Sequence, residues 1–218
     1  MTTASILSVQ TGAIAPLGPD HVPSAIVKQA RHGAVAVGTL GLDGDQQADL
    51  SVHGGEEKAV YGYGAAHFPA WAQAFPDKAG QFVPGAMGEN LTITGLVEAD
   101  LCLGDVHAIG SALLQVCQPR QPCFKFALKL GEPRVVKHMV QSGQSGWYYR
   151  VLKAGALAAG DAITLAERPN PDFSFARLVG IVNFGGASAA ELERMAAMDG
   201  LASQWRRKAR IALQKGAG

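Results

Sequence analysis

The chain has 218 residues, of which 48% are hydrophobic and 17% charged, so it can bury a sizeable core. Its formal net charge of +1 argues against a general nucleic-acid or membrane-surface binder, because such proteins need a basic excess. Three cysteines are too few, and too odd a number, for a disulfide framework. Since there is no signal-peptide pattern and no 18-residue apolar stretch, the sequence predicts a cytoplasmic protein.

Residues 1–168 contain many short runs of β-branched or aromatic residues separated by glycines. Such runs are typical of strands, and their number favours a closed or nearly closed antiparallel barrel. One helix is expected at 65–75, where Phe68, Trp71 and Phe75 recur at helical spacing and predict core packing. The strands are predicted within 4–12, 33–41, 58–64, 89–95, 111–118 and 161–168.

The composition changes at 169–172, where two prolines, an asparagine and an aspartate predict a linker. This linker divides the chain into a first domain at 1–168 and a helical segment at 172–218. Within that segment, Ser188 is followed three residues later by Glu191, which is the pattern of a capping box. Besides the helix at 65–75, helices are predicted at 132–143, 174–186, 188–200 and 202–216.

The helix at 202–216 is amphipathic and strongly basic. Its cations fit two interpretations, a solvated outer face or a docking surface for an acidic partner. The sequence alone leaves both open. The cations are Arg206, Arg207, Lys208, Arg210 and Lys215.

The stretch VCQPRQPCFK carries the strongest chemical signal in the chain. Pro119 and Pro122 oppose regular helix and a central strand, so Cys123 is predicted on a loop. Arg120 and Lys125 lie nearby, and cations stabilise a thiolate relative to a thiol. A loop thiolate among cations can act as a nucleophile or as a soft metal ligand.

The other cysteines and the histidines give weaker signals. Cys102 and Cys117 lie within apolar runs and are predicted core residues. Five residues separate Cys117 from Cys123, which fits ordinary zinc binding poorly. The six histidines form no HExxH pattern, although His53 is a candidate base for a cysteine nucleophile.

Two glycine-containing clusters could approach a ligand. In one, His53 precedes Gly54 and Gly55, and Lys58 follows; a Gly-Gly pair lets backbone come close to a bound molecule. The alternative is a pair of hairpin turns with polar surface residues. In the other, GAMGENLTITG, Asn90 could cap a turn or bind the edge of a heterocycle through its amide.

Five segments occur in a fixed order: LGLDGDQQAD, VHGGEEKAVYGY, GAMGENLTITGL, LGDVHAIGSALLQVCQPRQPCFK and SGWYYRVLKAG. Together they resemble the MOSC domain, named for the C-terminal domain of molybdenum cofactor sulfurases, and most of all its YiiM-like subgroup. The helical tail resembles the three-alpha domain that follows MOSC in that subgroup. The resemblance implies a mainly β fold, a MOSC-type β-barrel with peripheral helices, followed by a small three-helix segment.

The resemblance also implies a function. The loop cysteine, Cys123, would bind the molybdenum of a molybdopterin cofactor, as metal ligand and catalytic residue. Relatives of the amidoxime-reducing type reduce N-hydroxylated compounds with electrons from separate redox proteins, so such substrates and such a partner are expected. A sulfur carrier with a Cys123 persulfide, or a non-enzymatic cofactor-binding module, are the alternatives. Pyridoxal phosphate is not expected, because no lysine signature for a Schiff base is visible.

The resemblance assigns further site residues. Arg120 and Lys125 would balance the charge of an anionic molybdopterin. Asn90 and His53 would face the pterin or the substrate, with His53 as a second catalytic residue. Ser24, in PSAIVK, lies in a segment that resembles an early part of the family pattern. Weaker candidates for balancing charge are Lys28, Arg31 and Lys58.

Overall fold

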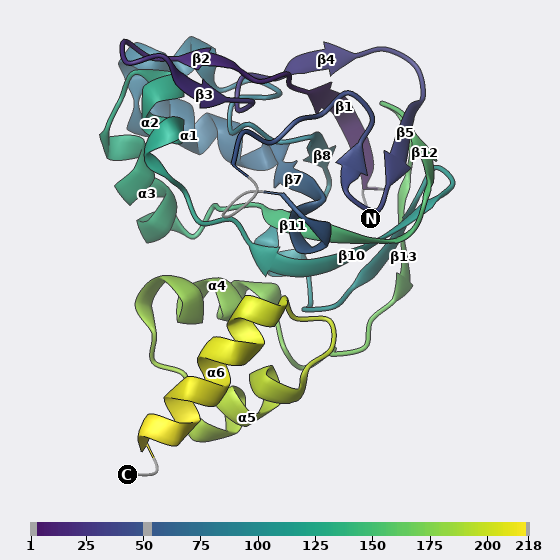
Figure 1. Cartoon of the computed structure of the whole chain (residues 1–218), viewed down its shortest axis with the longest axis vertical. Coiled ribbons are helices and arrows are strands. Elements are labelled where there is room, and N and C mark those ends of the chain that lie inside the picture. Colours follow the sequence, from purple (N-terminus) through teal and green to yellow (C-terminus); the bar gives the residue numbers. More distant parts are fainter. Residues whose placement is uncertain (1–3, 50–53, 217–218) are drawn as a thin grey trace.

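The structure is a computed structural model that describes residues 4–49 and 54–216. Its strands form one large sheet and two small ones in the upper part of Figure 1. The strands are β1 (Ser5–Thr11), β2 (Ala15–Leu17), β3 (Val22–Ser24), β4 (Gln29–Arg31), β5 (Val35–Gly38), β6 (Gly41–Leu42), β7 (Val60–Gly64), β8 (Leu91–Thr94), β9 (Val106–Ile109), β10 (Ala112–Pro119), β11 (Trp147–Lys153), β12 (Gly155–Leu157) and β13 (Ile163–Glu167).

The helices fall into two groups, one beside the large sheet and one below it in Figure 1. The first group is α1 to α3, and the second is α4 to α6. They are α1 (Phe68–Ala74), α2 (Phe124–Leu130), α3 (Arg134–Ser142), α4 (Phe175–Phe184), α5 (Ala189–Ala197) and α6 (Ser203–Gly216), with 3-10 turns η1 (Glu56–Lys58), η2 (Ala65–His67), η3 (Pro76–Gln81) and η4 (Glu98–Asp100).

The large sheet has eight strands in the order β13-β9-β10-β11-β7-β8-β1-β4. Its neighbours are antiparallel except β7 and β8, which run parallel. The sheet curls so that the residues around β13 reach the start of β1: Ile6 N–H donates to Asp161 O at 2.9 Å, and Ile163 N–H donates to Ala4 O at 2.8 Å. In the described part of the chain the end strands β4 and β13 nevertheless each pair with one neighbour only.

The expected closed, antiparallel and mainly β barrel is therefore corrected. The short strands are present, but they form an open mixed sheet, and about one third of the described residues are helical. The physical reason is that β4 pairs with the C-terminal part of β1, which leaves only the N-terminal end of β1 to contact the residues around β13. The one parallel pair arises because α1 and η3 carry the chain between β7 and β8.

Strand β7 lies inside the large sheet and is buried along its whole length. At its centre, Gly62 faces the aromatic side chains of β11. A Cβ atom on Gly62 would lie 3.0 Å from Trp147 Nε1 and 3.1 Å from a ring carbon of Tyr149. The missing side chain therefore lets two aromatic rings pack against the backbone of β7.

The helices α1 to α3 bury an aromatic cluster against β7. Phe68, Trp71 and Phe75 are all buried there, which confirms the core packing predicted from their spacing. Trp71 Nε1 donates to the hydroxyl of Tyr63 at 2.6 Å, so the polar atoms in the cluster are paired. Helix α3 confirms the helix predicted at 132–143, whereas α2 was not predicted.

The three predicted C-terminal helices are confirmed as α4, α5 and α6. The capping box is present, since Glu191 N–H donates to Ser188 Oγ and Ser188 N–H donates to Glu191 Oε2. Buried Leu178, Met195 and Trp205 belong to the same hydrophobic core as the large sheet, so the segment packs directly on it. The division into domains at 1–168 and 172–218 stays a prediction.

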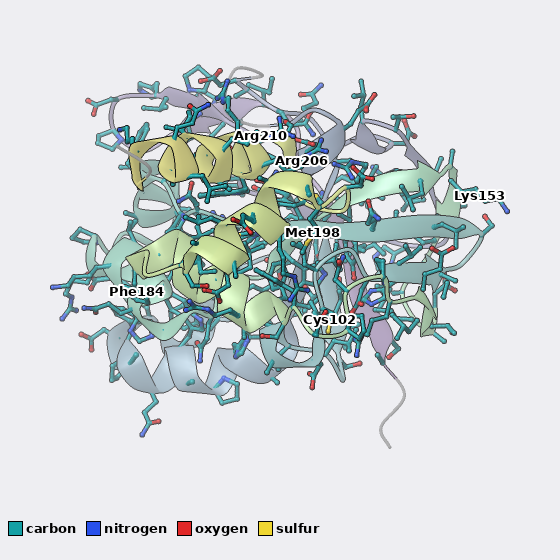
Figure 2. All side chains as sticks on the ribbon, turned by 90° about the horizontal axis from the view of Figure 1, so that it is seen from below. Cys102, Lys153, Phe184, Met198, Arg206 and Arg210 are labelled. Atoms are coloured by element: carbon teal, nitrogen blue, oxygen red, sulfur yellow. The ribbon has the colours of Figure 1, made fainter. Side chains whose placement is uncertain are left out.

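Figure 2 looks onto the face that carries these helices, with Arg206 and Arg210 on α6. Arg206 pairs with Asp199 at 3.4 Å, whereas Arg207 and Lys208 are exposed. Within residues 4–49 and 54–216, no helix has the length and apolar character needed to cross a membrane.

Candidate functional site

A pocket opens where the end of β10, the start of α2 and the loops after β3 and β6 meet. It collects six predicted site residues from separate parts of the sequence. The remaining one, His53, lies outside the described residues. Among the weaker candidates, Lys28 lines the pocket, whereas Arg31 lies on β4 and donates to Thr11 Oγ1 at 3.2 Å. The six are Ser24, Lys58, Asn90, Arg120, Cys123 and Lys125.

Cys123 sits on the pocket wall immediately before α2. Its backbone is extended, with φ −123° and ψ 173°, which confirms the predicted loop position. Its side chain is half-buried, whereas Cys102 and Cys117 are buried, as expected for core residues. Burial raises the pKa of the Cys117 thiol to about 12, which keeps that thiol protonated. Cys123 is thus the cysteine that faces the pocket.

Arg120 is a buried cation in the pocket wall. Its guanidinium carbon lies 5.0 Å from the ring centre of Tyr61 and 4.9 Å from that of Phe126. Its Nη1 donates to Met87 O at 2.5 Å. In the part of the chain that the structure describes, no carboxylate lies within ion-pairing distance of this guanidinium. A buried charge with neutral partners is costly, and an anionic ligand would offset that cost.

Lys28 is held in the pocket by an acidic partner that the sequence did not reveal. Its Nζ lies 2.5 Å from Asp45 Oδ1, and burial lowers the pKa of Lys28. Asp45 in turn accepts from Gly12 N–H at 2.7 Å and from Asn90 Nδ2 at 2.8 Å. The pair is therefore fixed by backbone and side-chain donors on both sides.

The amide of Asn90 is committed to the protein itself. Its Oδ1 accepts from Tyr61 N–H at 3.0 Å, and its Nδ2 donates to Asp45 and to Gln10 O. Asn90 lines the pocket, but these bonds use the amide groups that were expected to contact a pterin. The geometry favours a role in building the wall, and direct contact with a ligand stays a prediction.

A third cation, Lys129, lies behind the pocket wall. Its ammonium group donates to Gly85 O. The pKa of Lys129 is lowered to about 8, chiefly by burial; attraction to Glu89 raises it, and repulsion from Arg120 and Lys28 lowers it. Glu89 is buried and accepts from two backbone N–H groups and Thr92 Oγ1.

The charges in this cluster do not cancel. The cations Lys28, Arg120 and Lys129 face two carboxylates, Asp45 and Glu89, which leaves one positive charge in excess. Lys58 and Lys125 are further cations on the pocket wall. A partly enclosed site with surplus positive charge is suited to an anion.

Lys125, Ser24 and Lys58 are the remaining predicted residues that line the pocket. Lys125 Nζ donates to Pro23 O at 2.9 Å, and the hydroxyl of Ser24 accepts from Ile26 N–H at 3.2 Å. Lys58 is partly buried, and this burial lowers its pKa. All three side chains therefore belong to the wall of one pocket.

Sequence reasoning missed two tyrosines that complete the pocket. The rings of Tyr61 and Tyr148 lie 5.2 Å apart, and both line the pocket. Burial raises the pKa of Tyr148, so its phenol stays protonated near neutral pH. Tyr148 lies in SGWYYR, one of the segments that carried the resemblance, so a signal was present without an assigned role.

The comparisons with known proteins give the family of the chain. The MOSC domain model matches residues 49–164, a range that includes Cys123 and Arg120. The chain belongs to the MOSC domain family. Its YiiM-like character is shown by protein YiiM of Escherichia coli (strain K12), which is 35% identical over 201 residues, covering 92% of this chain and 89% of that protein.

Two further relatives extend the comparison of this MOSC protein. The crystal structure of YiiM from Geobacillus stearothermophilus superposes with a TM-score of 0.80 at 35% identity, over 96% of this chain and 99% of the other. A protein of Gibberella moniliformis (strain M3125 / FGSC 7600) named "Reductase" is 40% identical over 172 residues, covering 78% of this chain. The matched region spans 30% of that longer protein.

The pocket residues fit the group that the family implies. MOSC domains are associated with molybdenum cofactor binding. A molybdopterin carries a phosphate and a dithiolene, which are anionic, and the pocket has surplus positive charge around a buried arginine. Molybdenum favours soft sulfur ligands, and Cys123 offers one. Among the described residues, no group of three or more His, Cys, Asp or Glu is placed so that it could hold a metal ion.

Proposed function

We propose that this MOSC protein is a molybdenum-dependent oxidoreductase that reduces N-hydroxylated compounds such as hydroxylamino bases and amidoximes. The observation that carries the proposal is the buried guanidinium of Arg120, without a carboxylate partner in the described chain, in the same pocket wall as Cys123. A thiol beside uncompensated positive charge suits an anionic cofactor with a soft metal. The family and the relative named "Reductase" support an oxidoreductase role.

Each residue has a distinct role in this proposal. Cys123 Sγ would ligate the molybdenum, and Arg120 with Lys28 would hold the anionic part of the cofactor. The bound cofactor would supply two-electron redox chemistry. Reduction of an N–OH group to N–H consumes two electrons and two protons and releases water. The protonated phenol of Tyr148 lies in the pocket, where it can donate a hydrogen bond to the substrate oxygen.

Electrons would come from a separate redox protein, because the sequence shows no flavin or haem motif. We propose that the exposed cations of α6, Arg207 and Lys208, face this partner. Charge complementarity raises association rates and orients two proteins without large apolar contact. Because these residues are positively charged, the docking surface of the partner should be acidic.

The first experiment measures molybdenum by elemental analysis in protein from a cofactor-producing host. Wild type is expected to contain close to one molybdenum per chain, and Cys123→Ala almost none. Cys102→Ala is the matched control, because that cysteine is buried, donates to Pro171 O and does not line the pocket, so its loss should leave the metal content unchanged. Metal in Cys123→Ala at the wild-type level would refute the ligand assignment.

The alternative, a sulfur carrier, is distinguished in the same samples. If wild type contains no molybdenum, exposure to a cysteine desulfurase followed by intact-mass spectrometry tests for one added sulfur. Because Cys123 is only half-buried, its thiol can be reached by a sulfur donor, and a persulfide on it by a sulfur acceptor. Added sulfur that disappears in Cys123→Ala would favour the carrier over the oxidoreductase.

A further inference from the structure

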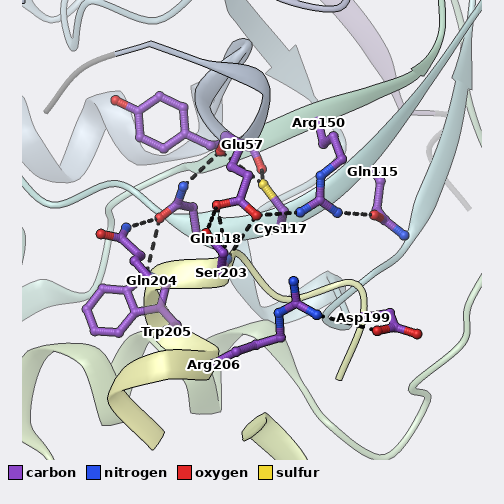
Figure 3. A network of polar contacts seen from close by, with 11 residues as sticks. Glu57, Gln115, Cys117, Gln118, Arg150, Asp199, Ser203, Gln204, Trp205 and Arg206 are labelled. Carbon is purple, nitrogen blue, oxygen red and sulfur yellow. Dashed lines mark hydrogen bonds and ion pairs between the residues drawn. The ribbon is translucent and has the colours of Figure 1, made fainter. Parts of the chain in front are cut away.

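Glu57 connects the pocket wall to the C-terminal helix α6 (Figure 3). Its carboxylate accepts from Ser203 N–H at 2.8 and 3.0 Å, from Ser203 Oγ at 2.8 Å, and from Arg150 Nη2 at 2.8 Å. Helix α6 begins at Ser203, and the preceding Ala202 has no polar side chain to cap it. Glu57 supplies this cap from a distant part of the sequence, at the positive end of the helix dipole.

The backbone of Glu57 is held as firmly as its side chain. Its carbonyl oxygen accepts from Gln118 Nε2 at 2.8 Å and from Cys117 Sγ at 3.1 Å, both on β10. The side-chain oxygen of Gln118 accepts in turn from Trp205 Nε1 at 3.1 Å and from Gln204 Nε2. Both the carboxylate and the backbone of Glu57 are therefore tied to α6, directly or through one residue.

These contacts matter because the next residue, Lys58, lines the pocket. Glu57 is the central residue of η1, and the turn is preceded by Gly54 and Gly55, whose φ values are 87° and 79°. Two glycines in this conformation give the chain before η1 little stiffness of its own. The strand β7 fixes the end of η1, and the contacts of Glu57 fix the rest of the turn.

We infer that Glu57 is a positioning residue that lets α6 hold Lys58 at the pocket. The helical segment would then contribute to ligand binding although the pocket-lining residues of the described chain all precede it. This inference rests on the proposed function in one respect, namely that the ligand of the pocket is anionic and contacts Lys58. It gives the C-terminal helices a role in the site that is separate from partner docking.

The direction in which anion binding changes when Glu57 is removed distinguishes a positioning role from a purely electrostatic one. Glu57 carries a negative charge, so its removal should strengthen the binding of an anion if only charge matters. Loss of the anchor should instead weaken binding, because Lys58 is no longer held in place. Glu56→Ala is a matched control, since Glu56 has the same charge on the same turn and its side chain is exposed.

The test titrates the full-length protein with inorganic pyrophosphate in a calorimeter. Lys58→Met is expected to weaken binding about 10-fold, the effect of losing one charge-assisted hydrogen bond. Glu57→Ala is expected to weaken it about 3- to 10-fold, and Glu56→Ala not at all. In Lys58→Met/Glu57→Ala, the second change should add almost nothing. Tighter binding in Glu57→Ala, or additive losses in the double variant, would overturn the inference.

Hydrogen exchange tests the anchor without any ligand. Amides of residues 54–60 are expected to exchange faster in Glu57→Ala and in Ser203→Ala, and at the wild-type rate in Glu56→Ala. Unchanged exchange in the first two variants would refute the anchoring role. If wild type fails to bind pyrophosphate, the anionic ligand and the part assigned to Lys58 are wrong, whereas the exchange rates still decide whether α6 holds η1.

Discussion

Replacing Lys129 by methionine should change how the stability of the protein depends on pH. Burial lowers the pKa of Lys129 from 10.5 to about 8, so between these values the unfolded chain binds a proton that the folded chain has released. Where the unfolded state binds more protons, the free energy of unfolding rises with pH. The charged Lys129 thus destabilises the fold below pH 8, and this cost disappears as pH rises through 8 to above 10.5.

The size of the effect follows from the shift. A difference of about 2.5 pKa units corresponds to roughly 3 kcal/mol, at about 1.4 kcal/mol for each unit. The difference in unfolding free energy between wild type and Lys129→Met should therefore increase by about 3 kcal/mol from pH 7.5 to pH 10.5. Taking this difference cancels the titration of the buried tyrosines and the other lysines, which both proteins share.

The measurement is urea unfolding at several pH values between 7.5 and 10.5. Lys137→Met is the control, because Lys137 is exposed on α3 and its removal should leave the pH dependence as in wild type. A difference curve for Lys129→Met that is flat over this range would refute the burial of surplus charge behind the pocket. The electrostatic argument for an anionic ligand would then rest on Arg120 alone.

Three further predictions concern the thiols and the helices. Iodoacetamide at pH 8 should modify Cys123 well before Cys117, whose burial raises its pKa to about 12; mass spectrometry of digested protein would show the order. Ser188→Ala should lower the free energy of unfolding by about 1 kcal/mol, measured in urea, because the N-cap of α5 is lost. Reversing Arg207 and Lys208 to glutamate should slow reduction by the redox partner and flatten the salt dependence of its rate, and unchanged stopped-flow rates would refute docking at α6.

Local signals in the sequence predicted the helices well. The spacing of Phe68, Trp71 and Phe75 identified a core face, and Gly143, whose φ is 71°, ends α3 as a left-handed C-terminal cap. Helix α2 was missed because Pro119 and Pro122, just before it, suggested irregular structure. Helix ends that depend on adjacent residues can thus be predicted from the sequence, whereas α2, which follows two prolines, was not predicted.

The sheet was predicted less well because its pairing is not local. The individual strands were recognisable, but the parallel contact of β7 with β8 joins segments separated by α1 and η3. The register Gly62↔Leu91 depends on packing across this distance. Many short strands therefore suggested a closed antiparallel barrel, since nothing in the strands themselves encodes a parallel neighbour.

The candidate site was likewise predicted where the signal is local in sequence and missed where it is not. Cys123 and Arg120 were identified from the neighbouring prolines and cations, Asn90 and Lys58 from two glycine-containing clusters, and Ser24 from the resemblance. The partner of Lys28, Asp45, was missed, and so was Lys129, because a lysine on a short helix has the same local pattern whether it is exposed or buried. Electrostatic partners far apart in sequence become visible only in the fold.

The surplus charge of the pocket is a collective property that links stability to binding. Lys28, Arg120 and Lys129 come from three separate segments; Arg120 disfavours the charged form of Lys28, and both of them disfavour the charged form of Lys129. The fold can tolerate this cost because two hydrophobic cores pack around the site. An anion in the pocket would relieve the repulsion and raise the affinity of these groups for protons. The arrangement that destabilises the free protein is therefore the same one that would favour its ligand.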